Sequence, residues 1–237
     1  MQLILLSAGR GSRLSQNLRK KPKSLATING KSILEHNTDF FNKFKKKYII
    51  TGYKGNLIKK FAKKNNFKII HNVKYKSTNM VYSSFLATKF IKEDVVICYG
   101  DIIFDSSIYN ILKEKKNIIP LNKNWLSVWK KRMNRKKIMK DAENVVTKKN
   151  ILLTIGGKIK SKLPKYQYMG LFKLKKNDFF KLSIYFKKIQ NKKIDMTSFL
   201  DKSIKKNKVK FYIKPYYKIW FEIDSYKDLV VASKELK

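Results

Sequence analysis

A glycine-rich segment near the N-terminus has the residue types that bind phosphate groups. The apolar run Gln2–Ser7 leads into Ala8-Gly9-Arg10-Gly11, which predicts a buried strand followed by a loop. Glycines let backbone N–H groups approach a phosphate closely, and the small residues Ser7 and Ala8 leave room for a flat base. The segment therefore predicts a nucleotide-binding loop, and an ordinary strand-to-helix turn is the alternative.

Two widespread phosphate-loop patterns do not fit this segment. A Walker A loop requires GxxxxGK[ST], and the chain contains no such string. The dinucleotide fingerprint requires GxGxxG, and here Leu14 stands where the third glycine should be after Gly9 and Gly11. A third kind of nucleotide loop has to be considered.

Two aspartates are placed where a metal ion could bind. Asp101 follows the most apolar predicted strand, and Asp224 follows the apolar residues Trp220 and Phe221. Magnesium is commonly held by one or two carboxylates together with phosphate oxygens. Asp101 and Asp224 are therefore candidate metal ligands, with Glu222 and Asp105 as weaker candidates; the alternative is a helix cap or a turn.

The charge of the chain is extreme: 56 Lys and Arg oppose 16 Asp and Glu, giving a formal charge of +40. Such a surplus is typical of nucleic-acid-binding proteins. However, only five of these cations are arginines, and the lysines are spread over all 237 residues. Lysine also rises together with Asn and Ile, which indicates a compositional bias. We do not expect nucleic acid as a partner, and a basic nucleic-acid-binding protein is kept as the non-enzyme alternative.

The order of elements predicts an α/β fold. In the first hundred residues, strands are expected at 2–7, 47–52, 67–71 and 94–100, and helices at 32–44, 56–65 and 78–91. This alternation is typical of a parallel sheet. Later, strands are expected at 166–173, 209–214 and 220–224, and helices at 178–189, 197–205 and 225–236. We predict one domain over 1–237, with a nucleotide-binding half at 1–110 and an acceptor-binding half at 111–237.

Other features indicate a soluble cytoplasmic protein. The N-terminus has no basic region before its short apolar run, and no stretch approaches the ~18 apolar residues of a membrane span. The single cysteine, Cys98, lies in a predicted strand and is expected to be core. His36 and His71 belong to no motif and are expected to be structural.

The glycine-rich loop resembles a known signature. Leu6 to Leu14 matches LxAGxGxRL, and Lys21-Pro22-Lys23-Ser24-Leu25 resembles the second element of the same family. The chain is thus similar to the nucleotidyltransferases that activate sugar phosphates and related compounds. It looks most like their small CTP-using branch, which acts on phosphocholine, 2-aminoethylphosphonate or phosphoglutamine. Strings at 77–83, 99–105, 125–129, 141–143, 166–171, 195–198 and 220–225 extend the resemblance.

This resemblance implies a fold and an activity. The fold would be a Rossmann-like, mostly parallel sheet flanked by helices. The activity would be Mg²⁺-dependent transfer of CMP from CTP to a small phospho- or phosphono-compound, with release of pyrophosphate, in cell-surface polysaccharide or lipid modification. A homodimer is left open. The alternative enzyme is a sugar-1-phosphate nucleotidyltransferase that uses UTP, dTTP or GTP.

The resemblance also implies residue roles. Arg13 and Lys23 would be catalytic and clamp the triphosphate and the attacking phosphate. The metal ligands would be Asp101 and Asp224. The nucleotide would be bound by Ser7, Ala8, Gly9, Gly11, Arg13, Thr78, Asn79 and Gly100. The acceptor would be bound by Lys23, Tyr82, Trp129, Arg132, Asp141, Glu143, Tyr168, Gly170 and Asp195, where aromatic rings could face an ammonium group and acids could pair with an amine. Core packing is the alternative for Trp125 and Trp129.

Overall fold

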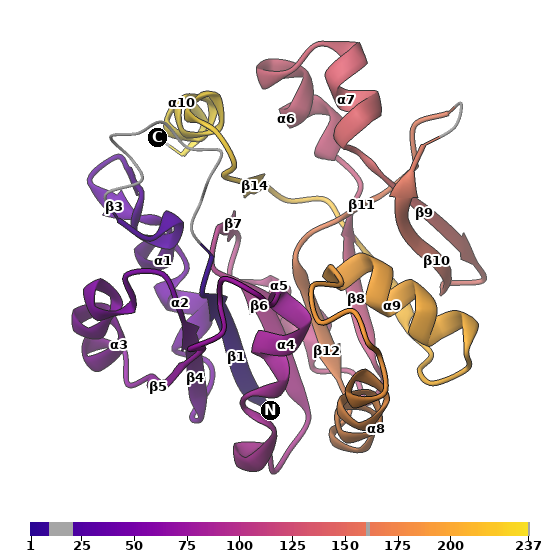
Figure 1. Cartoon of the computed structure of the whole chain (residues 1–237). Coiled ribbons are helices and arrows are strands. Elements are labelled where there is room, and N and C mark those ends of the chain that lie inside the picture. Colours follow the sequence, from indigo (N-terminus) through magenta and orange to yellow (C-terminus); the bar gives the residue numbers. More distant parts are fainter. Residues whose placement is uncertain (10–20, 160–161, 237) are drawn as a thin grey trace.

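The computed structural model describes residues 1–9, 21–159 and 162–236, and its centre is one large sheet (Figure 1). In these residues the sheet has ten strands in the order β5-β4-β1-β6-β12-β8-β13-β10-β9, with β11 paired to β8. The bounds are β1 Gln2–Ser7, β4 Lys47–Thr51, β5 Lys68–His71, β6 Val95–Tyr99, β8 Ile118–Asn122, β9 Glu143–Lys148, β10 Ile151–Lys158, β11 Gln167–Tyr168, β12 Leu171–Leu174 and β13 Tyr212–Tyr216. Strands from both halves of the chain therefore share one sheet.

The N-terminal part of the sheet is parallel. Strand β1 pairs in parallel with β4 on one side and β6 on the other, and β4 pairs in parallel with β5. All residues of β1, β4 and β6 are buried, as expected for parallel strands covered on both faces. Strand β12 enters antiparallel beside β6. The α/β class and the helix-flanked, mostly parallel central sheet are confirmed.

The flanking helices are short. They are α1 Ile33–His36, α2 Thr38–Phe41, α3 Lys59–Lys64, α4 Met80–Phe85, α5 Ile108–Leu112, α8 Lys176–Lys187, α9 Met196–Lys205 and α10 Tyr226–Glu235, with 3-10 turns at Lys23–Leu25, Gly55–Ile58 and Thr88–Phe90. Helix α9 packs on β10, and α5 packs on β8. Short strands complete the fold: β2 Thr27–Ile28 with β3 Lys31–Ser32, and β7 Ile102–Phe104 with β14 Trp220–Glu222.

Asn37 breaks the helix expected at 32–44 into α1 and α2. Its Nδ2 donates to the carbonyl oxygens of Ile33 (3.2 Å) and Ile102 (2.7 Å), and its Oδ1 accepts from the amide of Phe104 at 3.4 Å. Asn37 thereby ties this corner to β7, which explains the interruption. The helix expected at 78–91 likewise shrinks to α4 and a 3-10 turn.

Gly170 divides the strand expected at 166–173 into β11 and β12. It has a φ of +75°, and a Cβ at this position would lie 2.7 Å from Cδ2 of Tyr99. The strand expected from residue 209 begins only at Tyr212. Tertiary contacts therefore set these boundaries.

Several elements between residues 102 and 158 were not predicted. They include β7, α5, β8, helices α6 Trp125–Arg132 and α7 Arg135–Asp141, and the β9–β10 hairpin. The hairpin turns at Lys149 and Asn150, which both have positive φ without a glycine, and a proline at position 120 obscures β8. Figure 1 shows α6 and α7 at the top of the molecule, beyond the sheet.

The tryptophans are buried. The rings of Trp125 and Trp129 meet edge to face at 5.1 Å, Trp129 stacks on Trp220 at 6.4 Å, and Nε1 of Trp220 donates to the carbonyl oxygen of Met169 at 3.2 Å. Core packing is thus their main role.

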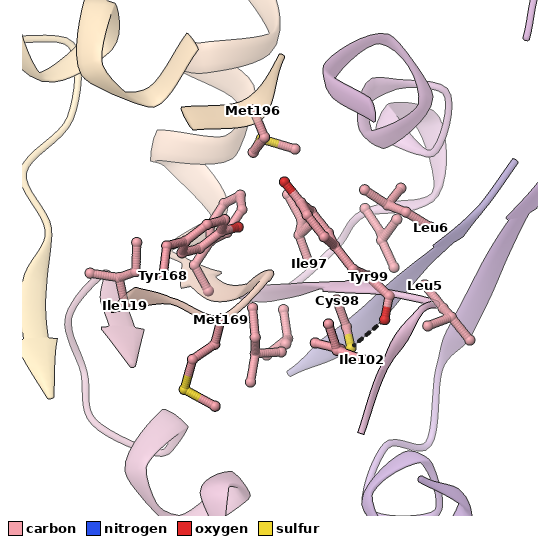
Figure 2. Close-up of a cluster of buried hydrophobic side chains, with 14 of the residues drawn as sticks. Leu5, Leu6, Ile97, Cys98, Tyr99, Ile102, Ile119, Tyr168, Met169 and Met196 are labelled. Atoms are coloured by element: carbon pink, nitrogen blue, oxygen red, sulfur yellow. Dashed lines mark hydrogen bonds between the residues drawn. The ribbon is translucent and has the colours of Figure 1, made fainter. Parts of the chain in front are cut away.

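Cys98 and the histidines are structural, as expected. Cys98 is fully buried in the cluster of Figure 2, and burial raises the pKa of its thiol. His36 Nε2 lies 2.9 Å from the carbonyl oxygen of Ile28, and His71 Nδ1 lies 3.1 Å from Oγ1 of Thr51. Among the described residues, no helix combines the length and apolar character needed to cross a membrane.

Gly170→Ala is expected to destabilise the fold more than Gly157→Ala. Both glycines have positive φ, but a Cβ at Gly157 would meet nothing within 4 Å. The control should cost roughly 1–2 kcal/mol from the backbone alone, whereas Gly170→Ala adds a clash with Tyr99 and should cost roughly 2–4 kcal/mol. Urea unfolding of the two variants measures the difference in the free energy of unfolding. Equal losses of stability would contradict the expected clash with Tyr99.

Candidate active site

The end of β6 is drawn tightly against β1. The amide of Gly100 donates to the carbonyl oxygen of Leu6 at 2.8 Å, and a Cβ at Gly100 would lie at 2.8 Å from the same oxygen. Oγ of Ser7, at the end of β1, lies 2.5 Å from Oγ of Ser24. The first glycine-loop residues, the Lys21–Leu25 segment and the end of β6 therefore meet at one edge of the sheet.

Strand β14 brings Asp224 to the same edge. It pairs antiparallel with β7, and the amide of Ile223 donates to the carbonyl oxygen of Asp101 at 2.9 Å. The two aspartates predicted as metal ligands are thereby placed together, although they are far apart in the sequence.

Lys23 lies between these two aspartates. Its Nζ donates to Oδ2 of Asp101 at 2.7 Å and also to Oδ1 of Asp224. Burial by itself lowers the pKa of Lys23, but the charges of Asp101 and Asp224 outweigh it, so that the pKa is raised. Lys23 therefore carries a firmly held proton and balances the carboxylates.

Glu222 adds a third carboxyl group beside them. Burial, followed by the charges of Asp224 and Asp101, raises the pKa of Glu222 to about 8. At neutral pH this group is thus mostly protonated, because Lys23 alone cannot balance three anions in a partly dehydrated site. The ammonium group of Lys23 does not balance the carboxyl groups of Asp101, Asp224 and Glu222, so an added cation would be stabilised here.

The aspartates provide oxygen donors suited to a hard cation. Oδ1 of Asp101 is buried and has no hydrogen-bond partner among the described residues. The same residues contain no group of three or more His, Cys, Asp or Glu side chains that could hold a metal by themselves. An ion at Asp101 and Asp224 would therefore need additional oxygens from phosphates or water, which is the usual situation of Mg²⁺. The residues present fit this ion.

A small cavity of about 120 Å³ lies beside Asp101. Of the residues predicted to bind the nucleotide, Ala8, Gly9, Thr78 and Asn79 line it. Ser7 and Gly100 are not among the lining residues, and Gly11 and Arg13 lie outside the described residues. The remaining lining residues are Leu6, Asn72, Tyr75, Met80, Ser83, Tyr99 and Asp101.

Asn79 is the N-cap of α4. Its Oδ1 accepts from the amide of Met80 at 2.8 Å, and its Nδ2 donates to the carbonyl oxygen of Lys193 at 3.2 Å. Asn79 therefore caps the helix at the border of the cavity. Thr78 Oγ1 donates to the carbonyl oxygen of Lys74 at 2.7 Å.

A larger cavity of about 980 Å³ adjoins the small one, since Met80 and Tyr99 line both. Its wall includes residues of α6 and α7. Most of the predicted acceptor-binding residues line it, namely Trp129, Arg132, Asp141, Glu143, Tyr168, Gly170 and Asp195, together with Asp224. Tyr82 is not among the lining residues, and its ring packs against Phe186 at 6.5 Å. Lys23, also predicted to bind the acceptor, is not among the lining residues, and it forms an ion pair with the lining residue Asp224.

Asp228 is a site residue that the sequence analysis missed. It is 2% exposed, and its Oδ2 accepts from the amides of Asp224 (2.9 Å) and Ser225 (2.6 Å). Its Oδ1 accepts from Nη1 of Arg132 at 2.5 Å. Asp228 thus connects the backbone at Asp224 to α6. The capping-box spacing of Ser225 and Asp228 is the signal that could have revealed it.

Gln167 was missed as well. It is 4% exposed, lines the large cavity, and its Oε1 has no hydrogen-bond partner in the described part of the chain. An unpaired buried amide oxygen is costly, so Gln167 marks a place where a water molecule or a ligand group can donate a hydrogen bond. Nothing in the sequence around Gln167 signals this.

Asp105, a weaker metal candidate, has a different role. Its Oδ1 accepts from the amide of Ser107 at 2.9 Å and from Nζ of Lys218 at 3.0 Å. These contacts make Asp105 a turn residue.

Comparison with known proteins agrees with this geometry. The chain is 29% identical over 187 residues to CTP:phosphoglutamine cytidylyltransferase of Campylobacter jejuni. The aligned residues cover 73% of this chain and 72% of that relative. It is also 35% identical over 124 residues to the bifunctional protein GlmU of Methanococcus maripaludis. Here the aligned residues cover 52% of this chain and 30% of GlmU. No model of a protein family matches the chain.

The fold has known counterparts. The structure of CTP:phosphocholine cytidylyltransferase from Streptococcus pneumoniae superimposes with a TM-score of 0.79 at 19% identity, over 100% of this chain and 99% of that one. The sheet and its flanking helices have the nucleotide-diphospho-sugar transferase fold, and the sequence of the chain is similar to those of nucleotidyltransferases. Among these proteins, the chain is similar to CTP-using cytidylyltransferases.

Asp228→Asn is expected to destabilise the protein by ~3 kcal/mol, because it leaves Arg132 without its buried partner. The matched control is Asp105→Asn. Asp105 also accepts from a neighbouring amide and a basic side chain, but its side chain is 41% exposed, so its loss should cost about 1 kcal/mol or less. Urea unfolding measures both changes. A loss at Asp228 no larger than at Asp105 would refute the connecting role.

Proposed function

We propose that this enzyme is a Mg²⁺-dependent cytidylyltransferase that transfers CMP from CTP to a small phospho- or phosphono-compound and releases pyrophosphate. One observation carries the proposal: Lys23 lies between the strand-end carboxylates Asp101 and Asp224, where a base-sized cavity meets a larger one. Triphosphate chemistry at that junction would have the base on one side and the acceptor on the other.

The relatives support CTP as the nucleotide. The Campylobacter jejuni relative and the Streptococcus pneumoniae protein are both named as enzymes that use CTP. The similarity to GlmU is shorter and covers less than a third of that protein. A sugar-1-phosphate nucleotidyltransferase that uses UTP, dTTP or GTP is kept as the alternative enzyme.

The reaction needs little covalent help from the protein. An oxygen of the acceptor phosphate or phosphonate forms a bond to the α-phosphorus of CTP, and the bond from that phosphorus to the bridging oxygen of the β-phosphate breaks. The leaving oxygen keeps the electron pair, and pyrophosphate departs. Because the nucleophile is already an anion, catalysis depends on alignment and on neutralising phosphate charge.

The described residues suit that task. Asp101 and Asp224 would hold Mg²⁺, which when bound neutralises phosphate charge and favours departure of pyrophosphate. Lys23, whose pKa is raised, stays protonated and can donate to the phosphates when its carboxylate partners are engaged elsewhere. Arg13, which lies outside the described residues, is proposed as the second clamp.

The substrates are tested by pyrophosphate release. Four nucleoside triphosphates are combined with phosphocholine, 2-aminoethylphosphonate, phosphoglutamine, glycerol phosphate and hexose-1-phosphates, with Mg²⁺ and with excess EDTA. We expect release with CTP and an amine-bearing acceptor and none with EDTA. Release with UTP or dTTP and a hexose-1-phosphate would establish the alternative enzyme, and no release from any pair would refute the proposal.

The carboxylates are tested by Asp101→Asn and Asp224→Asn. Each variant removes one metal ligand and leaves Lys23 the other aspartate, so we expect turnover to fall at least ~10³-fold with the fold retained. Asp39→Asn, a change of an exposed acid on α2, is the control and should be neutral. Circular dichroism verifies folding, and near-normal turnover in folded Asp101→Asn would remove the proposed metal site.

A further inference from the structure

Helices α6, α7 and α10 form one end of the molecule, and this end is basic. Helix α6 packs against both α7 and α10, and Figure 1 shows the three helices at the top. Their acids are few, and two are already paired: Glu235 with Lys131 at 2.7 Å, and Asp228 with Arg132. The exposed cations of these helices that form no ion pair with another described residue are Lys130, Arg135, Lys136, Lys137, Lys140, Lys227 and Lys234. The end therefore carries positive charge that its own acids do not balance.

A groove of about 700 Å³ lies between α6 and α10. Residues of these two helices line it, and on α10 they include Lys227, Val230, Val231 and Lys234. Side chains three, four and seven positions apart share one face of a helix, so the two valines form an aliphatic strip between the two lysines. The groove thus combines an apolar surface with cations on either side of it.

The exposed aromatic side chains of the described chain lie at this end. Tyr226, the first residue of α10, is 64% exposed and lines the groove, and Tyr217 is 61% exposed. The carbonyl oxygen of Tyr217 accepts from Nδ2 of Asn124 at 2.7 Å, and Asn124 is the N-cap of α6. Tyrosine joins an apolar ring to a polar hydroxyl, which suits the boundary between water and lipid.

The residue types at this end favour a lipid surface over a nucleic acid. Lysine is a point charge that attracts lipid phosphates without a fixed geometry, whereas the planar fork of arginine suits nucleic-acid recognition. Arg135 is the exposed arginine of these helices, because the side chain of Arg132 is only 9% exposed and is paired with Asp228. The valine side chains offer no hydrogen-bonding group to a base, but they can lie against lipid chains.

We propose that this end of the molecule binds the surface of membranes that contain anionic phospholipids. The lysines of α6, α7 and α10 would attract the phosphates, and Tyr226, Val230 and Val231 would contact the boundary of the acyl region. Arg132, Tyr226 and Lys227 line both the groove and the large cavity, so the bound surface lies beside that cavity. This interaction does not depend on the proposed catalytic activity.

Co-sedimentation of the full chain with lipid vesicles tests the proposal. One set of vesicles is phosphatidylcholine alone, and the other also contains phosphatidylglycerol as a substantial minority. At physiological ionic strength we expect binding to the anionic vesicles to be at least ~10-fold tighter than to the neutral ones, and added salt to weaken it. Equal binding to both sets, or binding to neither, would overturn the proposal.

The double variant Lys227→Gln with Lys234→Gln tests the location of the surface. We expect it to weaken binding to the anionic vesicles at least ~5-fold. The control is Lys59→Gln with Lys63→Gln, which removes the same charge from two exposed, unpaired lysines on α3, away from this end in Figure 1. Circular dichroism verifies that both variants fold. Equal losses in the two would show that binding follows the charge of the whole chain and would overturn the assignment.

Tyr226→Ser tests the apolar part of the contact. We expect it to weaken vesicle binding roughly 3-fold or more, because it removes the exposed ring beside the groove. Ile184→Ser on α8 is the control, since Ile184 is also exposed, at 58%, and lies outside the groove. A loss in Tyr226→Ser no larger than in the control would contradict the contact with the acyl boundary.

Titration with polyuridylate separates lipid from nucleic acid. We expect the double variant and its α3 control to bind this single-stranded RNA equally, because lysines spread over the chain attract a polyanion wherever they lie. A loss of RNA binding that is confined to the double variant and exceeds its loss on vesicles would assign this end to nucleic acid. That result would overturn the proposal.

Discussion

The ion pairs of Lys23 with Asp101 and Asp224 are the interaction on which the site depends. They join three segments that the sequence separates: the turn after Pro22, the end of β6 and the end of β14. Three carboxyl groups and one ammonium group in a partly buried space leave an excess of negative charge. Protonation of Glu222, whose pKa is raised, removes part of this negative charge. A divalent cation is the natural complement of such an arrangement.

The surroundings of this cluster are built to hold its geometry. Gly100 lets β6 approach β1 closely. The carboxylate of Asp228 accepts a hydrogen bond from the amide of Asp224 and another from Arg132, which belongs to α6. Helix α6 is in turn held by Trp129, which stacks on Trp220 and meets Trp125 edge to face. The wall of the large cavity and the proposed metal ligands are therefore mechanically connected. A substitution in α6 that moves Arg132 is therefore expected to shift Asp228 and the backbone at Asp224.

Part of the large positive charge lies at the large cavity, whose lining includes Arg132, Lys137, Lys140 and Lys227. Many lysines are exposed, and several lie over aromatic rings, such as Lys68 at 4.1 Å from the ring centroid of Phe90. The lysine that matters for the proposed reaction is buried between two acids. The scarce carboxylates organise the site, because each charge taken out of water must be matched by a partner or a proton.

The sequence by itself determined the class of fold, and it singled out Lys23 and the two strand-end aspartates, which the structure brings together, since these depend on local patterns of apolar runs and motif spacing. The predicted nucleotide loop lies mostly outside the described residues and stays a prediction. The sequence did not determine α6, α7 or the β9–β10 hairpin, where Pro120 and the glycine-free turn at Lys149 and Asn150 hide the usual signals. Nor could it reveal Asp228 and Gln167, whose importance lies in hydrogen bonds made or missing across distant segments. Only the tertiary structure decided these, because burial and pairing are properties of the folded chain and not of any one segment.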